Sequence, residues 1–143
     1  MNRKWTEDLS GIVLPSIILD VNQFDELDSI LPISFCKNQV DILICINMIH
    51  ISPFSSTENL FKIVDKCMQT DGFLLTYGPY RVDNFMVESN VKFDQSLRSR
   101  NQEWGIRDLE EVAAVARRHG IDVSEVVKMP SNNLCVVFKR IKR

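Results

Sequence analysis

Asp41-Ile-Leu-Ile-Cys-Ile-Asn-Met-Ile-His-Ile-Ser-Pro53 is the part of the chain around which the other elements can be placed. The unbroken apolar run from Ile42 to Ile46 is too short for a helix, so it predicts a strand buried on both faces, as in parallel sheets covered by helices. Asn47, Met48 and His50 follow at the carboxyl end of this strand, which is where open α/β sheets bind their ligands. We therefore expect the functional site at this end.

The residues after this strand predict a helix and then a second buried strand. Ser52-Pro53 is typical of a helix start, and Ser55 with Glu58 has the spacing of a capping box. Asp71-Gly72 ends the helix, and Phe73 to Tyr77 forms the next strand. Apolar residues at helical spacing form one face that covers the sheet: Leu60, Ile63, Val64, Cys67 and Met68.

Two shorter elements are expected before the central strand. Residues Ser16 to Val21 follow Pro15 and are rich in branched side chains, which predicts a short strand that ends near the acidic Asp20. Asn22 to Ile30 has the pattern of a weak helix or a loop.

The second half of the chain predicts a lid, a helix and a hairpin. The polar segment from residue 81 to 107 is long for a connection within a compact domain, so we interpret it as a lid. Asp108 and Glu111 can cap a helix that ends at Gly120. The apolar face of this helix is Leu109, Val112, Ala113 and Ala116. Val123 to Met129 and Leu134 to Phe138 flank a Pro-Ser-Asn-Asn turn, as in a hairpin. This order predicts a single α/β domain over residues 1–143 with an antiparallel edge.

Composition limits the classes of function. The 17 basic and 19 acidic side chains nearly balance, which argues against a nucleic-acid partner and against an anionic membrane surface. No segment has the length of a membrane-spanning helix, and the start of the chain has no signal core. The four cysteines are far apart and have no zinc spacing, which favours buried thiols over disulfides. We expect an intracellular, cytoplasmic protein without a bound metal.

Several blocks of the sequence resemble the signature blocks of the methyltransferase-like protein 26 family, whose members are class I S-adenosylmethionine-dependent methyltransferase-like proteins. The blocks occur in order from about Val13 to the C-terminus: Leu19-Asp20-Val21, Cys45-Ile46-Asn47-Met48-Ile49-His50-Ile51-Ser52-Pro53, Tyr77-Gly78-Pro79-Tyr80, Ser89-Asn90-Val91-Lys92-Phe93-Asp94, Leu97-Arg98-Ser99-Arg100, Glu103-Trp104-Gly105-Ile106-Arg107-Asp108 and Met129-Pro130-Ser131-Asn132-Asn133. The resemblance implies a Rossmann-like fold, S-adenosylmethionine as the cofactor, and an unidentified small molecule or protein as the methyl acceptor.

Two parts of that family have no counterpart in this sequence. Its members begin with a strand and a Gly-rich turn that holds the methionine part of the cofactor, and continue with a strand whose acidic end holds the ribose. The glycines here are too far apart for a Gly-x-Gly turn: Gly11, Gly72, Gly78, Gly105 and Gly120. We therefore expect an N-terminally truncated, partial Rossmann-like fold that lacks the first two strands and does not bind S-adenosylmethionine normally.

The missing strands would leave open sheet edges. Either the strand at Ile17 pairs with Ile42 to Ile46, or the open edge pairs with a second copy in a homodimer or with another partner. A methyltransferase-like protein of unknown substrate is thus the leading hypothesis for the function. The alternative is a non-catalytic remnant that acts through interaction or self-association.

The resemblance also implies site residues. Asp20, Asn47 and Met48 would contact the cofactor, although Asp20 could instead cap the loop at Asn22. His50 is the candidate for a catalytic base, because its ordinary pKa lies near neutrality. The alternative, which we favour on the sequence, is that the His50 side chain donates a hydrogen bond to the Ser-Pro turn and only shapes the loop.

A substrate cleft is expected beside these residues. Its candidate lining is Tyr77, Tyr80, Asn90, Asp94, Arg98 and Arg107, with Arg100 and Trp104 nearby. Carboxylate, guanidinium and amide groups of this kind suit a polar substrate. An internal ion pair between Asp94 and an arginine is an equally good explanation of those charges.

Overall fold

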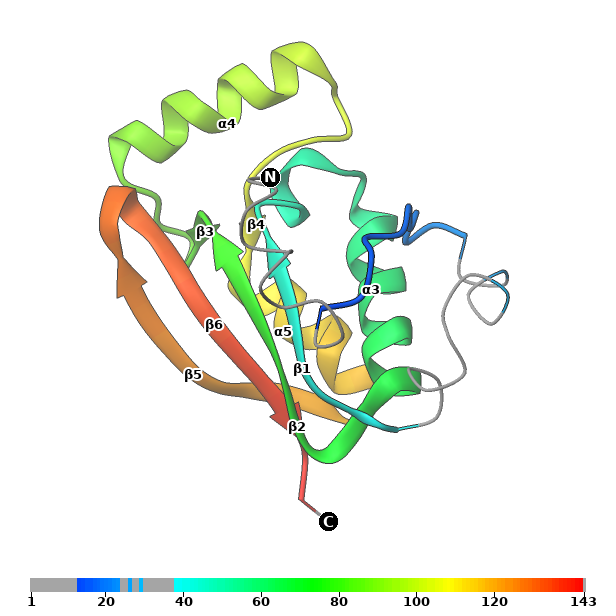
Figure 1. Cartoon of the computed structure of the whole chain (residues 1–143). Coiled ribbons are helices and arrows are strands. Elements are labelled where there is room, and N and C mark those ends of the chain that lie inside the picture. Colours follow the sequence, from blue (N-terminus) through cyan, green and yellow to red (C-terminus); the bar gives the residue numbers. More distant parts are fainter. Residues whose placement is uncertain (1–12, 24–25, 27–28, 30–37, 143) are drawn as a thin grey trace.

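The computed structural model describes residues 13–23, 26, 29 and 38–142 (Figure 1). The main sheet in this part of the chain has four strands in the order β1-β2-β6-β5. Their bounds are β1 (Val40–Ile46), β2 (Met68–Gly78), β5 (Ile121–Met129) and β6 (Asn133–Arg140). β1 and β2 run parallel, whereas β6 pairs antiparallel with both β2 and β5. The predicted second strand and the C-terminal hairpin are therefore confirmed.

Two helices cover one face of the sheet, α3 (Phe54–Cys67) and α5 (Leu109–Arg118) (Figure 1). Both were predicted, and their apolar faces meet the sheet as expected. The rings of Phe61 on α3 and Phe138 on β6 pack edge to face, 5.2 Å apart. Side chains from these elements share one core: Leu60, Phe61, Val64, Leu74, Val112, Val115, Ala116, Ile121, Val136 and Phe138.

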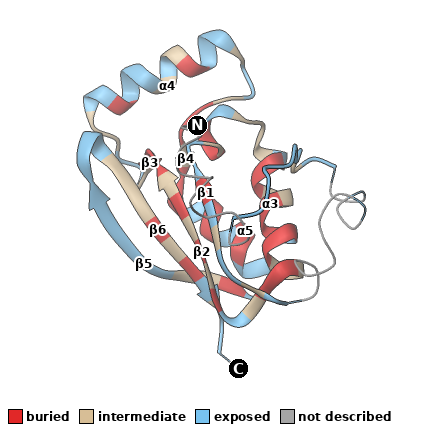
Figure 2. Cartoon of the chain, viewed as in Figure 1, coloured by how far each residue is buried: buried red, intermediate tan, exposed pale blue. Residues whose placement is uncertain are grey.

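The prediction that β1 is buried on both faces is wrong. Leu43 and Cys45 pack on the core side, but the alternate residues Ile42, Ile44 and Ile46 are exposed, with Ile44 63% accessible (Figure 2). Among the described residues β1 pairs only with β2, so it is an edge strand. An apolar run predicts that a strand is buried. It does not determine whether another element packs against each of the two faces.

The predicted strand at residues 16–21 is also absent. Residues 14–20 have no regular secondary structure, and Ile18 is 95% exposed. Branched side chains favour an extended backbone, but a strand forms only where a neighbouring strand accepts its hydrogen bonds. The expected helix or loop from Asn22 to Ile30 lies largely outside the described residues.

The segment from 81 to 107 contains a helix that was not predicted. It comprises part of the short strand β3 (Tyr80–Arg81), the helix α4 (Glu88–Arg100) and the start of β4 (Arg107–Asp108), which pairs parallel with β3. Figure 1 shows α4 above the carboxyl ends of β1 and β2. This helix has few apolar residues, so its sequence lacks the apolar periodicity by which a helix is predicted. Only Asn90 and Leu97 are buried. The position agrees with a lid, and its opening stays a prediction.

Several element boundaries differ from the sequence prediction. Pro53 is the residue before α3 and makes no side-chain cap, and Met68 begins β2 instead of ending the helix. Asp108 does precede α5, but its carboxylate pairs with Arg81 and does not cap the helix. Arg81 thereby joins β3 to β4 at the base of the lid segment.

The far end of the sheet is fixed by Arg140. Its guanidinium donates hydrogen bonds to the Asp65 carboxylate at 2.8 Å and to the carbonyl oxygens of Asp65 and Met68 at 2.7 and 2.8 Å. These bonds connect the end of β6 to the end of α3. The carboxyl end of the sheet, where the site was expected, is held by a different set of contacts.

The cysteines agree in part with the expectation of buried thiols. Cys45 and Cys135 carry free thiols, and burial raises the pKa of Cys45 to about 11. Cys67 is buried, whereas Cys36 lies outside the described residues. None of the described helices is long and apolar enough to span a bilayer.

Candidate functional site

The chain leaves β1 through a sharp turn at Asn47. Its φ of 54° lies in the left-handed region, which asparagine tolerates better than most residues. The Asn47 backbone N–H donates to the Tyr77 carbonyl oxygen at 2.9 Å, so the turn stays attached to the end of β2. A single turn of 3-10 helix, η3 (Ile49–Ile51), follows and directs His50 back over the sheet.

His50 is buried, with only 5% of its surface exposed. Its imidazole makes no hydrogen bond to any of the described residues. The Ser52 hydroxyl donates to the Met48 carbonyl oxygen at 2.9 Å instead, so the predicted bond between His50 and the Ser-Pro turn is absent.

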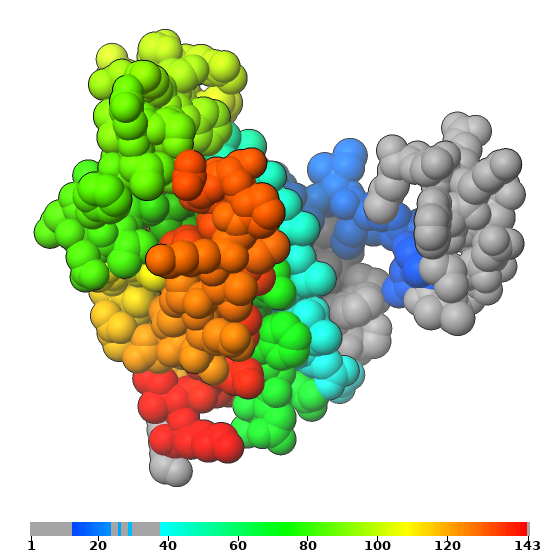
Figure 3. Space-filling view, turned by 90° about the vertical axis from the view of Figure 1, so that its left-hand side faces the viewer, coloured from blue at the N-terminus to red at the C-terminus, as the bar shows by residue number. Residues whose placement is uncertain are grey.

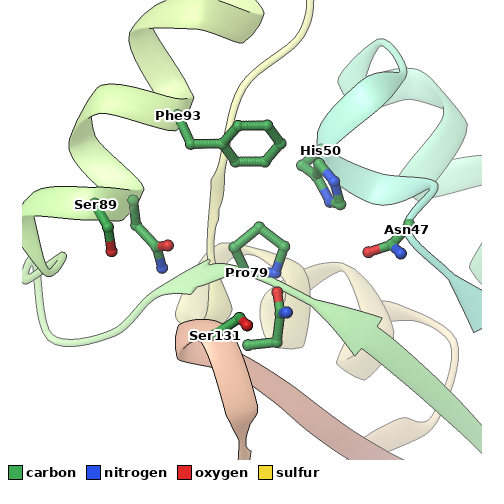
Figure 4. Close-up of a pocket in the computed structure, with 8 residues that line it drawn as sticks. Asn47, His50, Pro79, Ser89, Phe93 and Ser131 are labelled. Atoms are coloured by element: carbon green, nitrogen blue, oxygen red, sulfur yellow. The ribbon is translucent and has the colours of Figure 1, made fainter.

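His50 faces a cavity that we call the polar pocket (Figure 4). The ring of Phe93 on α4 lies edge-on to the imidazole at 5.7 Å. The pocket has a volume of about 460 Å³ and is lined by Asn47, His50, Pro79, Ser89, Asn90, Phe93, Ser131 and Asn133. None of these side chains carries a fixed charge. The pocket therefore suits a neutral group that donates or accepts hydrogen bonds.

Glycine at position 78 leaves room for the imidazole. A Cβ atom placed there would lie 3.2 Å from Nδ1 of His50, which is tighter than ordinary van der Waals contact. A side chain at this position would require the ring to move by a few tenths of an ångström. The end of β2 thus contributes to the space that the His50 ring occupies.

Burial and charge both act on the His50 imidazole. Burial is the larger cause and lowers its pKa, and the nearby guanidinium of Arg107 lowers it further. Since the ordinary value is 6.5, His50 is neutral at pH 7 and has a nitrogen lone pair available to accept a proton.

The segment that returns from α4 is bonded directly to the His50 turn. The Gly105 backbone N–H donates to the His50 carbonyl oxygen at 3.0 Å, and the Arg107 guanidinium donates to the Ser52 carbonyl oxygen at 2.8 Å. These bonds hold one side of the pocket wall. They also explain why Arg107 does not line the pocket, since its side chain lies over Phe54 with 5.6 Å between guanidinium carbon and ring centre.

The opposite wall joins α4 to the hairpin. Asn90 Nδ2 donates to the Asn132 carbonyl oxygen at 3.1 Å, and Asn132 Nδ2 donates to the Ser89 hydroxyl at 3.0 Å. Asn132 belongs to the 3-10 turn η4 (Pro130–Asn132) between β5 and β6. Two side-chain bonds therefore connect the lid helix to the rest of the site.

The structure separates the predicted cleft residues. Asn90 lines the polar pocket, and the Tyr77 hydroxyl accepts a hydrogen bond from Asn133 Nδ2 at 3.2 Å next to it. The Tyr80 hydroxyl bonds Thr76 at 2.7 Å inside the core, and burial raises its pKa. Asp94 and Arg98 form an ion pair at 2.8 Å, which is the internal pairing given as the alternative.

The predicted cofactor residues are not gathered at one place. Asn47 lines the polar pocket, whereas Met48 is half-buried against the core. Asp20 lies elsewhere and accepts hydrogen bonds from the Asn22 backbone and side chain at 2.9 and 3.1 Å, as the loop-cap alternative describes. Asn22 in turn accepts a bond from Ser56 at the start of α3 at 3.1 Å.

The described residues do not by themselves fit S-adenosylmethionine. The polar pocket contains no carboxylate that could receive ribose hydroxyl groups, and the glycines nearest to it accommodate protein side chains. No group of three His, Cys, Asp or Glu side chains in the described part of the chain could hold a metal ion.

Sequence reasoning did not select five of the pocket residues, namely Pro79, Ser89, Phe93, Ser131 and Asn133. All five occur inside the blocks that resemble the methyltransferase-like family. Ser89 and Phe93 also have the i, i+4 spacing that places two side chains on one side of a helix. The helix itself would have had to be predicted for that spacing to be useful.

Comparison with known families gives one direct match. The model of the family described as "Protein of unknown function (DUF938)" matches residues 4–140. This chain belongs to that family.

Solved structures show which fold the family member has. LaPhzM matches with a TM-score of 0.71 and 14% identity over 97% of this chain and 38% of its own. The mitomycin 7-O-methyltransferase MmcR matches with a TM-score of 0.68 and 17% identity over 96% of this chain and 38% of its own. CalO1, a methyltransferase in calicheamicin biosynthesis solved in its SAH-bound form, has a TM-score of 0.61 and 13% identity over 70% of this chain and 30% of its own.

These similarities identify a Rossmann-like methyltransferase fold. The predicted fold class, a partial fold of this type with a C-terminal antiparallel hairpin, is confirmed. At such low identity the likeness concerns the fold alone. The chain spans 38% or less of the length of these three neighbours.

Proposed function

We propose that this chain is a methyltransferase-like protein, of the methyltransferase-like protein 26 type, whose described residues form the acceptor side of a methyl-transfer cleft. The observation that carries the proposal is the buried His50 imidazole, without a hydrogen bond to the described residues, at the carboxyl end of β1. The sequence blocks and the shared methyltransferase fold support the same conclusion. The polar pocket contains most of the groups that an acceptor would need.

His50 would act as the general base. Methyl transfer to a hydroxyl or amine releases a proton, and the neutral imidazole can accept it from the attacking oxygen or nitrogen. The amide side chains of Asn47 and Asn90 would orient the acceptor by hydrogen bonds at the same pocket. Phe93 would limit rotation of the imidazole, because its ring packs edge-on against it at 5.7 Å.

S-adenosylmethionine, when bound, supplies the methyl group as an electrophilic sulfonium. We propose that Asn47 and Met48 contribute the contacts of this chain to it, and that its other contacts come from outside the described residues. With so few contacts, the chain alone should bind S-adenosylmethionine with a dissociation constant on the order of 1 mM or weaker.

The test is an NMR titration of the ¹⁵N-labelled chain with S-adenosylmethionine, alongside calorimetry. We expect weak binding, with amide shifts concentrated from Asn47 to His50. The Asn47→Gly variant keeps the left-handed backbone and removes the amide side chain, so these shifts should shrink. Asn84→Gly is a matched control, because Asn84 has a φ of 59° at a turn outside the polar pocket.

Two results would contradict the proposal. The first is the absence of any shift near Asn47 at about 5 mM S-adenosylmethionine, a concentration that would detect binding in the millimolar range. This result would reject the proposed contacts of Asn47 and Met48 with the cofactor. The second is micromolar binding of S-adenosylmethionine by this chain alone. It would show that the chain holds the cofactor as well as the methyl acceptor. Asn84→Gly should reproduce the titration of the unmodified chain.

A further inference from the structure

A second cavity adjoins the polar pocket, and we call it the apolar cleft. It has a volume of about 780 Å³, within the range of small-molecule sites. Apolar side chains from two segments form much of its lining and include Val82, Phe85, Met86, Val126, Met129 and Leu134. Figure 3 shows these segments, the one after β3 and the β5–β6 hairpin, side by side beneath α4.

Phe85 is held at this cleft although it is 68% exposed. Backbone hydrogen bonds join Val82 and Phe85 in both directions, at 2.8 and 3.2 Å. The two residues between them, Asp83 and Asn84, have φ angles of 51° and 59°, as in a tight two-residue hairpin turn. The Asp83 N–H also donates to the Glu110 carboxylate at 3.1 Å, which attaches the turn to α5. The aromatic ring is thus exposed on a fixed backbone.

The apolar cleft and the polar pocket share part of their walls. Asn90 and Asn133 line both cavities. The amide nitrogen of each donates a hydrogen bond within the protein, to Asn132 and to Tyr77 respectively. The amide oxygens accept no hydrogen bond from the described residues, so they are available to a donor at the junction.

We infer that the methyl acceptor is an amphipathic small molecule with a neutral hydroxyl or amine head in the polar pocket and an apolar, aromatic-sized body in the apolar cleft. This inference rests on the proposed function for the identity of the ligand as an acceptor. The uncharged lining of the polar pocket selects a neutral head. The two charged residues of the cleft, Asp83 and Lys128, have opposite signs and are both exposed, so they favour neither a cationic nor an anionic body.

A burial argument sets the expected preference. An apolar body of this kind gains roughly 25 cal/mol for each Å² removed from water, whereas a carboxylate head would lose hydration without a cation to replace it. A phenol with a short alkyl chain should therefore bind, and the corresponding benzoate should bind much more weakly.

The test uses 4-propylphenol and 4-propylbenzoate as probes in NMR titrations without cofactor. We expect 4-propylphenol to shift the side-chain amide signals of Asn90 and Asn133 and the His50 ring, and 4-propylbenzoate to bind at least about tenfold more weakly. Val126→Asp places a charge in the cleft and should weaken 4-propylphenol binding at least about tenfold.

Val127→Asp is the matched control. Val127 follows Val126 on β5, has a similar exposure of 39% against 43%, and lines neither cavity. Equal binding of the two probes, or equal effects of the two variants, would overturn the inference. Because neither measurement requires S-adenosylmethionine, phenol binding with no response to the cofactor would reject the proposed function alone.

Discussion

At the scale of single residues, His50 shows how an interpretation from sequence can be reversed by neighbours. A histidine before Ser-Pro was expected to bond the turn, yet the Ser52 hydroxyl is already engaged with the Met48 carbonyl oxygen. The imidazole instead lies beside Gly78 of β2 and the ring of Phe93 of α4. Its burial has a consequence for stability.

The folded protein should lose stability as His50 becomes protonated. Burial and Arg107 lower its pKa below 6.5, so the unfolded chain binds a proton more readily than the folded one at acidic pH. Above pH 6.5 His50 is mostly neutral in both states, so the free energy of unfolding keeps its full value. The free energy of unfolding falls as the pH decreases from 6.5 toward the folded pKa. We expect His50→Gln to flatten the decline in melting temperature between about pH 7 and pH 5, where roughly 2–4 °C corresponds to about 1 kcal/mol.

His119→Gln is the control for that measurement. His119 follows the last residue of α5 and is half-buried, with its ring 3.8 Å from the Asp65 carboxylate and outside the polar pocket. Thermal unfolding of the three proteins across this range gives the comparison. A decline in His50→Gln as steep as in the unmodified chain would show that protonation of His50 does not affect stability.

At the scale of elements, α4 is less embedded than α3 and α5. Its residues are mostly exposed, and Leu97 is its main apolar anchor (Figure 2). Hydrogen bonds from Asn90 and Asn132 hold its first turn against the hairpin. An element with few buried apolar contacts opens at a low free-energy cost, which is what a lid over the polar pocket requires.

Removing one of these bonds should loosen the first turn of α4. Asn132→Gly deletes the side chain that donates to Ser89 and retains a residue suited to the φ of 57° at this position. The loss of one hydrogen bond, about 1 kcal/mol, should speed amide exchange in the first turn about fivefold. Hydrogen-exchange mass spectrometry measures this rate.

Ser131→Gly provides the matched comparison. Ser131 has a φ of 59° in the same turn, and its side chain makes no hydrogen bond to α4. Exchange in α4 should stay at the unmodified rate in this variant. If both variants accelerated exchange equally, the flexibility of the turn would be responsible, and the Asn132 bond would have no special part in holding the lid.

At the scale of the whole molecule, β1 has an exposed apolar face. Ile42, Ile44 and Ile46 project from this side of β1, and the other edge of the strand has no partner among the described residues. An exposed, apolar edge strand is a template for pairing with another chain. The sequence-based hypothesis of a homodimer through this edge therefore stays a prediction. The surface it would use is the exposed side of β1.

A lysine on this surface should oppose self-association. We expect the unmodified chain to be dimeric at micromolar concentration and Ile44→Lys to raise the dimer dissociation constant at least about tenfold. Light scattering after size exclusion measures the oligomeric state. Ile18→Lys is the control, since Ile18 is highly exposed in the segment before the sheet. A monomeric unmodified chain would reject the homodimer.

The sequence by itself determined the elements whose pattern is local. The apolar period of α3 and the alternating hairpin strands depend on neighbours a few residues away, so β2, β5, β6 and both packed helices could be predicted. The predicted helix end at Asp71-Gly72 is wrong, because α3 ends at Cys67 and these two residues lie within β2. Of the polar residues predicted after β1, Asn47 and His50 line the polar pocket at the carboxyl end of the strand, and their function stays a prediction.

Only the tertiary structure decided which of these elements are covered and which side chains meet. The exposure of Ile44, the pairing of Arg81 with Asp108 and the burial of His50 each depend on residues distant in sequence. The polar pocket combines the ends of β1 and β2, the first turn of α4 and the β5–β6 turn. A side chain is buried or hydrogen-bonded only when a second segment packs against it. The sequence of one segment does not show which second segment that will be.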